Sequence, residues 1–242
     1  MAACKESLLP ATLSPVNTGA KSMTQVEQVV ARLTDDIIAC RLLPDARLHI
    51  AALAEQLGVS LGAVREALAA LAADRLVIAQ PQRGYRVSPI SGKSLTHLVQ
   101  ARVQIECLCL AEAIQHGDLQ WEKRCLSAWE AMQKLRHAKD GAQTAAAAAR
   151  IHAHDVFHYA LVSGCPNEWL LRMQCSLYQQ SERYRRLVNV TGPQTRDIDA
   201  EHQALLEIVL ARDAQGACAL LTQHLNRTAR MALDSPLLDC GP

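Results

Sequence analysis

The chain of 242 residues has few aromatic residues, no large excess of charge of either sign and no long uninterrupted apolar stretch. A membrane-spanning helix needs about 18 or more apolar residues in a row, so none is expected. The N-terminus contains Lys5 and Glu6 and lacks the apolar core of a secretory signal. We therefore expect a cytoplasmic protein that has no membrane partner.

The cysteine pattern and the net charge also give no indication of a specific function. The nine cysteines are scattered and odd in number, which is not the pattern of a secreted disulfide framework, so reduced thiols in a core are predicted. The net charge of +1 gives no general sign of nucleic-acid binding. Any such binding must depend on individual, well-placed arginines.

Alanine and leucine are what the chain has in abundance, and half of its residues are apolar. These side chains lose little entropy in a helix, so a mainly α fold is predicted. Single domains usually hold roughly 100–150 residues, so this length predicts two. Residues 1–22 mix Pro, Ser, Thr and Gly without a period and are interpreted as a flexible arm.

A pair of helices is predicted next. Thr24 and Glu27 form a capping-box pattern, and apolar residues then recur at helical spacing to about residue 40. A short second helix covers residues 50–57 and ends at Gly58.

A third helix and a β-hairpin follow this pair. Ser60 can cap the third helix, and a glycine-containing turn between two short helices is typical of a helix-turn-helix. The β-prone segments 76–79 and 85–87 then flank a turn that ends at Gly84, where a positive φ is expected. We predict a winged helix-turn-helix domain over residues 23–90.

From Ser94 onward almost every stretch favours a helix, with glycine and proline as interruptions. This pattern predicts an all-α helical bundle over residues 94–232, followed by a tail at 233–242. The predicted helices cover about 94–116, 118–138, 143–163, 167–190, 194–212 and 214–232.

The stretch "LPDARLHIAALAEQLGVSLGAVREALAALAADRLV" with the later "QRGYRV" resembles the N-terminal domain of the GntR family of transcription regulators. The resemblance implies double-stranded operator DNA as the partner, with a recognition helix in the major groove. The residues that it and the helix geometry assign to DNA are Ser60, Leu61, Gly62, Arg65, Arg83 and Gly84.

Arg65 is the strongest of these candidates. A guanidinium that contacts guanine with two hydrogen bonds contributes roughly 1–3 kcal/mol of discrimination. The alternative is a surface ion pair with a neighbouring helix. Arg83 and Gly84 would meet phosphate or the minor groove, or form only a solvated hairpin tip. Leu61 stands where relatives often carry a basic residue, and contact with a thymine methyl group is one hypothesis for it.

Histidines recur in the helical region with a spacing typical of a metal site. His154 and His158 are four residues apart, so their rings share one face of a helix. His202 and His224 lie on later helices, which can bring further ligands to the same cation. One such histidine alone would be interpreted as a hydrogen-bonded core residue. The set of four predicts a metal cation held within the bundle.

The pieces "HDVFHYALVSGCPN" and "EHQALLEIVLARDAQGACALLTQHL" resemble the FCD effector domain, which follows this winged helix in the GntR family. The resemblance implies a divalent metal, commonly zinc, held by one acidic residue and three histidines, with an organic acid beside it. Nickel and manganese are the alternatives to zinc. The histidines correspond to His158, His202 and His224, and the acidic position to His154. Imidazole cancels no cation charge, so an anionic effector, a small carboxylate or sugar acid, is expected. Asp155 lies about 100° further around the helix and is interpreted as an outer or surface residue, although direct ligation stays open.

Two arginines are candidates for holding the effector. Arg102 stands where relatives place an arginine that faces the cavity, and a guanidinium can bind a carboxylate with two hydrogen bonds. The alternative for Arg102 is an ion pair with Glu106, one turn later. Arg185 belongs to a basic turn near the end of a helix, where a cation that offsets the helix dipole is the alternative.

Together these features predict a transcription repressor and not an enzyme. A homodimer is expected because a single helix-turn-helix reads only a half-site. A metallohydrolase built on the helix of His154 and His158 is one alternative. Against it, Asp155 is a methylene shorter than the usual glutamate base, and a fourth histidine closes the open metal position. A helical interaction module that does not bind DNA is the second alternative.

Overall fold

The computed structural model describes residues 23–137, 143–188, 196–235 and 238, so the predicted arm at 1–22 and part of the predicted tail lie outside the described residues. The described residues form two units. The N-terminal unit contains residues 23–98, 178–188, 229–235 and 238, and the histidine unit contains residues 99–137, 143–177 and 196–228. The domain limits at 23–90 and 94–232 stay a prediction.

Helix α1 (Gln25–Ile38) begins with the predicted capping box. The Thr24 side chain accepts a hydrogen bond from the Glu27 backbone N–H, and the Glu27 carboxylate accepts one from the Thr24 N–H at 2.8 Å. These two bonds satisfy N–H groups that a helix start otherwise leaves without partners. The apolar face that follows, including Val29 and Leu33, is buried.

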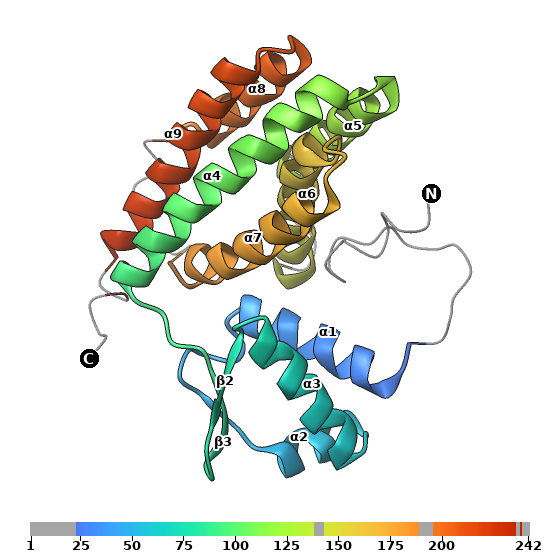
Figure 1. Cartoon of the computed structure of the whole chain (residues 1–242), viewed down its shortest axis with the longest axis vertical. Helices are drawn as coiled ribbons and strands as arrows, with labels where there is room; N and C mark the ends of the chain where they lie inside the picture. Colours follow the sequence, from blue (N-terminus) through green and yellow to red (C-terminus); the bar gives the residue numbers. More distant parts are fainter. Residues whose placement is uncertain (1–22, 138–142, 189–195, 236–237, 239–242) are drawn as a thin grey trace. The chain divides into compact units, whose positions relative to one another are not determined.

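Helices α2 (Ile50–Leu57) and α3 (Leu61–Ala73) form the predicted helix-turn-helix (Figure 1). Gly58 ends α2 in the left-handed conformation at φ 64°, which glycine adopts without steric cost. Ser60 caps α3 by accepting a hydrogen bond from the Ala63 N–H at 3.1 Å. One face of α3 is fully buried through Val64, Ala67, Leu68 and Leu71.

A small antiparallel sheet completes the winged helix. Its strands are β1 (Arg47–Leu48), β2 (Val77–Gln80) and β3 (Gly84–Val87), in the order β1-β3-β2. Gly84 begins β3 with φ 84°, as the predicted hairpin requires. The sequence did not predict β1, because two residues carry no periodic signal.

The rest of the described chain is helical, as predicted. Its helices are α4 (Gly92–His116), α5 (Leu119–His137), α6 (Gln143–Val162), α7 (Glu168–Val188), α8 (Ile198–Leu210) and α9 (Ala214–Leu233). Helix α8 begins four residues later than predicted because Asp197 caps it, accepting from the Ala200 N–H at 3.0 Å. No helix among the described residues is long and apolar enough to cross a membrane.

The core of the histidine unit uses the few aromatic residues of the chain. The fully buried Trp121 donates a hydrogen bond from Nε1 to the Ala160 carbonyl at 2.9 Å, which ties α5 to α6. Phe157 is also fully buried, 5.7 Å between ring centroids from Trp129 and 5.3 Å from His202. The apolar core therefore packs directly against an imidazole of the predicted metal site.

Candidate metal centre and DNA-reading surface

The outer side of α3 carries the predicted base contacts. Ser60, Leu61, Gly62 and Arg65 are exposed, while the opposite face of the helix fills the core. The ion pair considered as an alternative for Arg65 is not present among the described residues. Arg65 is thus available on the exposed surface of the recognition helix.

The turn of the β2–β3 hairpin exposes Arg83 and Gly84, the residues predicted to contact phosphate or the minor groove. The neighbouring Arg86 differs, because its Nε donates to the Asp45 carbonyl at 3.0 Å and its guanidinium lies 3.6 Å from the Asp45 carboxylate. Arg86 therefore braces the sheet, whereas Arg83 extends from the wing.

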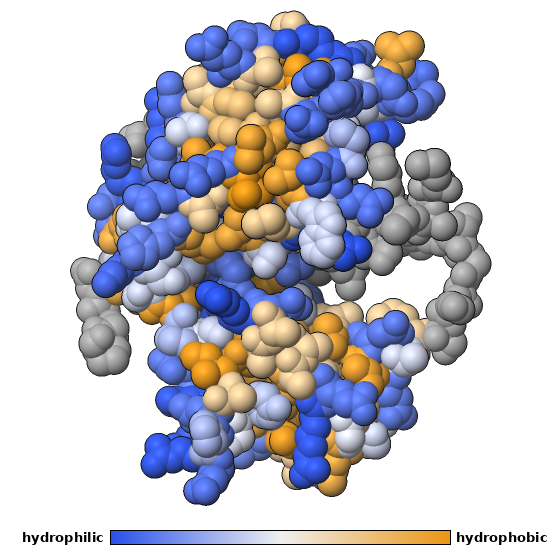
Figure 2. Space-filling view, viewed as in Figure 1, coloured by the Kyte–Doolittle hydropathy of each residue, from blue (hydrophilic) through white to orange (hydrophobic). Residues whose placement is uncertain are grey.

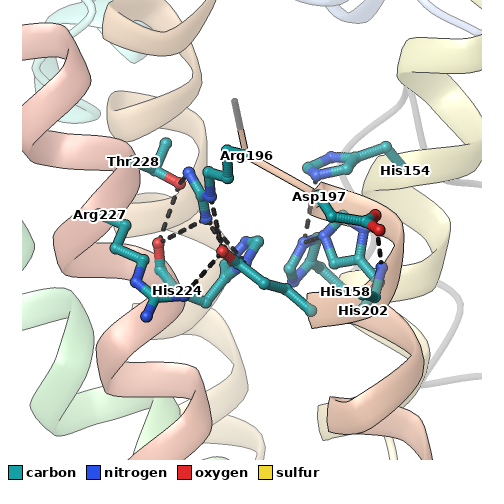
Figure 3. Close-up of polar contacts among 10 residues, drawn as sticks. His154, His158, Arg196, Asp197, His202, His224, Arg227 and Thr228 are labelled. Atoms are coloured by element: carbon teal, nitrogen blue, oxygen red, sulfur yellow. Dashed lines mark hydrogen bonds and ion pairs between the residues drawn. The ribbon is translucent and has the colours of Figure 1, made fainter. Parts of the chain in front are cut away.

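The four predicted histidines gather inside the second unit (Figure 3). His154 and His158 come from α6, His202 from α8 and His224 from α9. The Nε2 atom of His158 lies 3.2 Å from the Nε2 atoms of both His154 and His202. Ligand atoms of these three residues all lie within 4.8 Å of one another. The His224 ring is adjacent, with its centroid 4.8 Å from that of His202.

The spacing of the Nε2 atoms fits a zinc-sized cation. Zinc binds imidazole nitrogen at about 2.0–2.1 Å in a tetrahedron, which places neighbouring ligand atoms about 3.3 Å apart. Without a cation the contacts are poorly satisfied, because the Nε2 atom of His158 either donates once or accepts once, and it faces two other ring nitrogens. A cation that accepts all three lone pairs resolves this conflict.

Burial prepares these imidazoles to act as neutral ligands. Burial lowers the pKa of His158 well below its usual range, and the nearby histidines and Arg102 add to the shift. Burial also lowers the pKa of His202 to about 3 and lowers that of His224. Since only a neutral imidazole can bind a metal, protons do not compete for the site near neutral pH.

Glu201 and Arg196 are functional candidates that sequence reasoning missed. The Glu201 carboxylate lies 2.9 Å from Nδ1 of His224, and Arg196 reaches the same carboxylate at 2.5 Å. The Arg196 guanidinium, with His224 and Arg227, holds the pKa of Glu201 well below its usual range. Glu201 adjoins His202 in sequence but contacts His224 on another helix, so no local spacing could have indicated the contact.

Asp155 is buried, and its carboxylate lies 3.7 Å from Nδ1 of His154. Nδ1 is the ring nitrogen that does not face His158, so this carboxylate approaches the back of the ligand ring. Metal-bound histidines usually have a carboxylate on this side of the ring. Whether Asp155 is an outer residue or a direct ligand stays a prediction.

The two arginines predicted to bind the effector are both in ion pairs. Nε of the buried Arg102 donates to Glu106 at 2.6 Å, and Gln174 donates to the same carboxylate at 3.2 Å. Arg185 donates from Nε to Glu182 at 2.7 Å within α7. The pairing considered as an alternative for Arg102 is therefore present, although Arg102 also acts electrostatically on His158.

Comparison with known families gives two matches. The model of the gntR family of bacterial regulatory proteins matches residues 25–87, and the model of the FCD domain matches residues 97–227. Among curated relatives, the uncharacterized HTH-type transcriptional regulator BphR of Paraburkholderia xenovorans is 35% identical, covering 88% of this chain and 87% of its own. The HTH-type transcriptional repressor GlaR of Escherichia coli is 34% identical, covering 80% and 89%.

Solved structures share the fold. A GntR regulator from Rhodococcus sp. RHA1 aligns with a TM-score of 0.71 at 22% identity, over 88% of this chain and 99% of that chain. McbR/YncC of E. coli aligns with a TM-score of 0.72 at 22% identity, over 87% and 98%. At this identity the likeness supports the fold alone.

Proposed function

Because this chain belongs to the GntR family of DNA-binding transcription regulators, with an FCD domain behind its helix-turn-helix, we propose that it is a metal-dependent sensor of a small organic acid. Its operator affinity would be controlled by a carboxylate or sugar acid bound at the histidine cluster. Repression relieved by the acid is the mode we propose, and the family assignment leaves no role for catalysis.

One observation carries the proposal: the Nε2 atoms of His154, His158 and His202 converge with separations of 3.2 Å from the central one. At that spacing, the ring nitrogens of the buried His158 and His202 and of the half-buried His154 suit a divalent cation. When bound, the cation would supply a positive charge that attracts an acid.

The protein's own groups define what that acid must be. All four candidate ligands are neutral imidazoles, so none of the cation's charge is cancelled and an anion is favoured. Arg102 is buried beside the cluster and adds positive charge, which Glu106 partly offsets. A carboxylate could compete with Glu106 for the Arg102 guanidinium, because both groups offer the same pair of oxygens. Arg185 is a second proposed contact that would have to leave Glu182 in the same way.

On the DNA side, we propose that Ser60, Leu61, Gly62 and Arg65 meet base edges while Arg83 and Gly84 meet the backbone. Two half-sites require a homodimer. Figure 2 shows apolar side chains gathered over α4, and Leu108 on that helix is 52% exposed. An exposed apolar area of this kind is typical of an interface and supports the dimer.

The proposal is tested by measuring operator binding in the presence and absence of metal and of candidate acids. Purified protein is titrated onto the DNA upstream of its own gene at fixed salt, with and without zinc, during a screen of small carboxylic and sugar acids. We expect at least one acid to weaken DNA binding only in the zinc-loaded protein, because an effector must prefer one state to shift affinity.

The double variant His158→Ala/His202→Ala is the matched control, since it keeps the whole DNA-reading surface. We expect it to bind DNA and to ignore the acid. An acid response that survives in this variant, or zinc-independent release, would contradict the proposed sensing site.

A further inference from the structure

His224 has two charged groups close to its Nδ1 atom. The Glu201 carboxylate lies 2.9 Å from this atom. The Arg196 guanidinium, which lies beside His224 in Figure 3, is 3.2 Å from it. A carboxylate can only accept a hydrogen bond and a guanidinium can only donate one. The same ring nitrogen therefore faces two groups that require opposite states of it.

Each of these two states fixes the other ring nitrogen. If Nδ1 carries the proton and donates to Glu201, Nε2 keeps its lone pair and can bind a metal. If Nδ1 instead accepts from Arg196, the neutral ring must carry its proton on Nε2, and that nitrogen cannot bind. The choice between Glu201 and Arg196 is thus a choice between a ligand and a non-ligand.

We propose that Glu201 is a positioning residue that selects the metal-binding tautomer of His224 and so completes the centre with a fourth ligand. The inference rests on the proposed metal-dependent function and names the residue that makes His224 fit it. Glu201 prevails because its contact with Nδ1 is the shorter of the two, and because the competing Arg196 Nη2 atom donates at 2.5 Å to the Glu201 carboxylate itself.

Arg196 holds Glu201 in this position. Its Nε and Nη2 atoms donate to the two carboxylate oxygens at 2.8 and 2.5 Å, and Nη1 donates to Thr228 at 3.0 Å. A further contact joins Nη2 to the backbone carbonyl of His224 at 3.2 Å. The guanidinium therefore joins the start of α8 to α9, and it fixes the distance between Glu201 and the ring.

His202 differs from His224 in the surroundings of its Nδ1 atom. It is 1% exposed, and its Nδ1 atom has no hydrogen-bond partner among the described residues. Nothing there selects a tautomer, although Nε2 lies 3.2 Å from His158. The contrast indicates that the polar groups around Nδ1 of His224 are not a feature that burial alone provides, since His202, which is also buried, lacks them.

The first measurement reads the tautomer directly in metal-free, full-length protein. Long-range proton–nitrogen correlation NMR of the histidine rings distinguishes a protonated Nδ1 from a protonated Nε2. We expect His224, assigned by its loss in His224→Ala, to carry the proton on Nδ1. A proton on Nε2 in the wild-type protein would overturn the proposal without any variant at Glu201.

The second measurement uses Glu201→Gln, which keeps the shape of the side chain and removes its charge. We expect the His224 proton to shift toward Nε2 and zinc affinity, from chelator competition, to fall about 10–100-fold toward that of His224→Ala. Glu207→Gln is the control, because Glu207 lies exposed on the same helix and its side chain accepts, among the described residues, only from Gln203. We expect this control to bind zinc like the wild type.

The two proposals fail differently. Glu201→Gln protein that keeps a protonated Nδ1 and wild-type zinc affinity would overturn the role of Glu201, even if the acid response is intact. Wild-type protein that binds no zinc would contradict the proposed function. The NMR measurement of the His224 tautomer needs no metal, so it would still test the role of Glu201.

Discussion

The N-terminal unit and the histidine unit place their functional residues in opposite ways. In the N-terminal unit the candidate contacts are exposed on one helix and one hairpin, close together in sequence. In the histidine unit they are mostly buried and come from α6, α8 and α9, between residues 154 and 224 of the sequence. A surface that reads DNA needs groups free to meet a partner, whereas a metal centre needs neutral ligands removed from water.

The difference predicts that core damage in one unit leaves the function of the other in place, and Phe157→Ala is the largest test. Phe157 is fully buried against His202, and its removal is expected to cost about 3–5 kcal/mol of unfolding free energy with loss of zinc binding. Urea denaturation and metal analysis measure both. Leu68→Ala, in the other core, is the matched control and should keep zinc. Equal zinc loss in both variants would contradict the separation.

Arg65→Ala tests the separation of the two functions by changing the DNA-reading surface alone. We expect the free energy of operator binding to weaken by about 1–3 kcal/mol, because a bidentate base contact is lost, with zinc content unchanged. Fluorescence anisotropy at fixed salt is the measurement. Arg124→Ala removes an exposed arginine from α5 and should leave affinity within error. If the two variants weaken binding equally, Arg65 acts only through net charge.

Alkaline pH should affect the histidine unit through its buried thiols. Burial raises the pKa of Cys125 and Cys175 from 9.0 to about 12. Unfolded thiols lose their protons above about pH 9 while folded ones keep them, so this stabilisation is complete below pH 9 and is lost as pH rises toward 12. The expected loss is at most about 1.4 kcal/mol per thiol and pH unit.

Urea unfolding at about pH 8 and about pH 10.5 measures this loss, with native thiol alkylation as a second readout. The variant Cys125→Ala/Cys175→Ala should show a shallower dependence on pH. An identical dependence in the variant would assign the effect to other groups, such as Tyr159, whose pKa burial also raises to about 12.

Leu61→Ala has the smallest expected effect. If Leu61 covers a thymine methyl group, truncation should cost about 1 kcal/mol of operator affinity or less, the scale of burying one methylene. The loss should disappear on an operator in which uracil replaces thymine at the contacted position. A loss that is unchanged on that DNA would show that Leu61 does not contact the methyl group.

The same contrast explains how much the sequence could predict. The capping box at Thr24, the Gly58 turn and the Ser60 cap are short-range patterns, and all three are confirmed. The four histidines could be predicted as a set because His154 and His158 have the i, i+4 spacing typical of metal ligands on one helix face. Glu201 and Arg196 were not, because a carboxylate and a guanidinium are common on helices and only the packing of α8 against α9 pairs them with His224.

Metal analysis of the full-length protein tests the account most directly. After equilibration with zinc and removal of the excess, the wild-type protein should retain one zinc ion per chain, and His158→Ala/His202→Ala should retain none while keeping its helical circular dichroism. Zinc content that is the same in the folded variant as in the wild type would contradict the histidine centre.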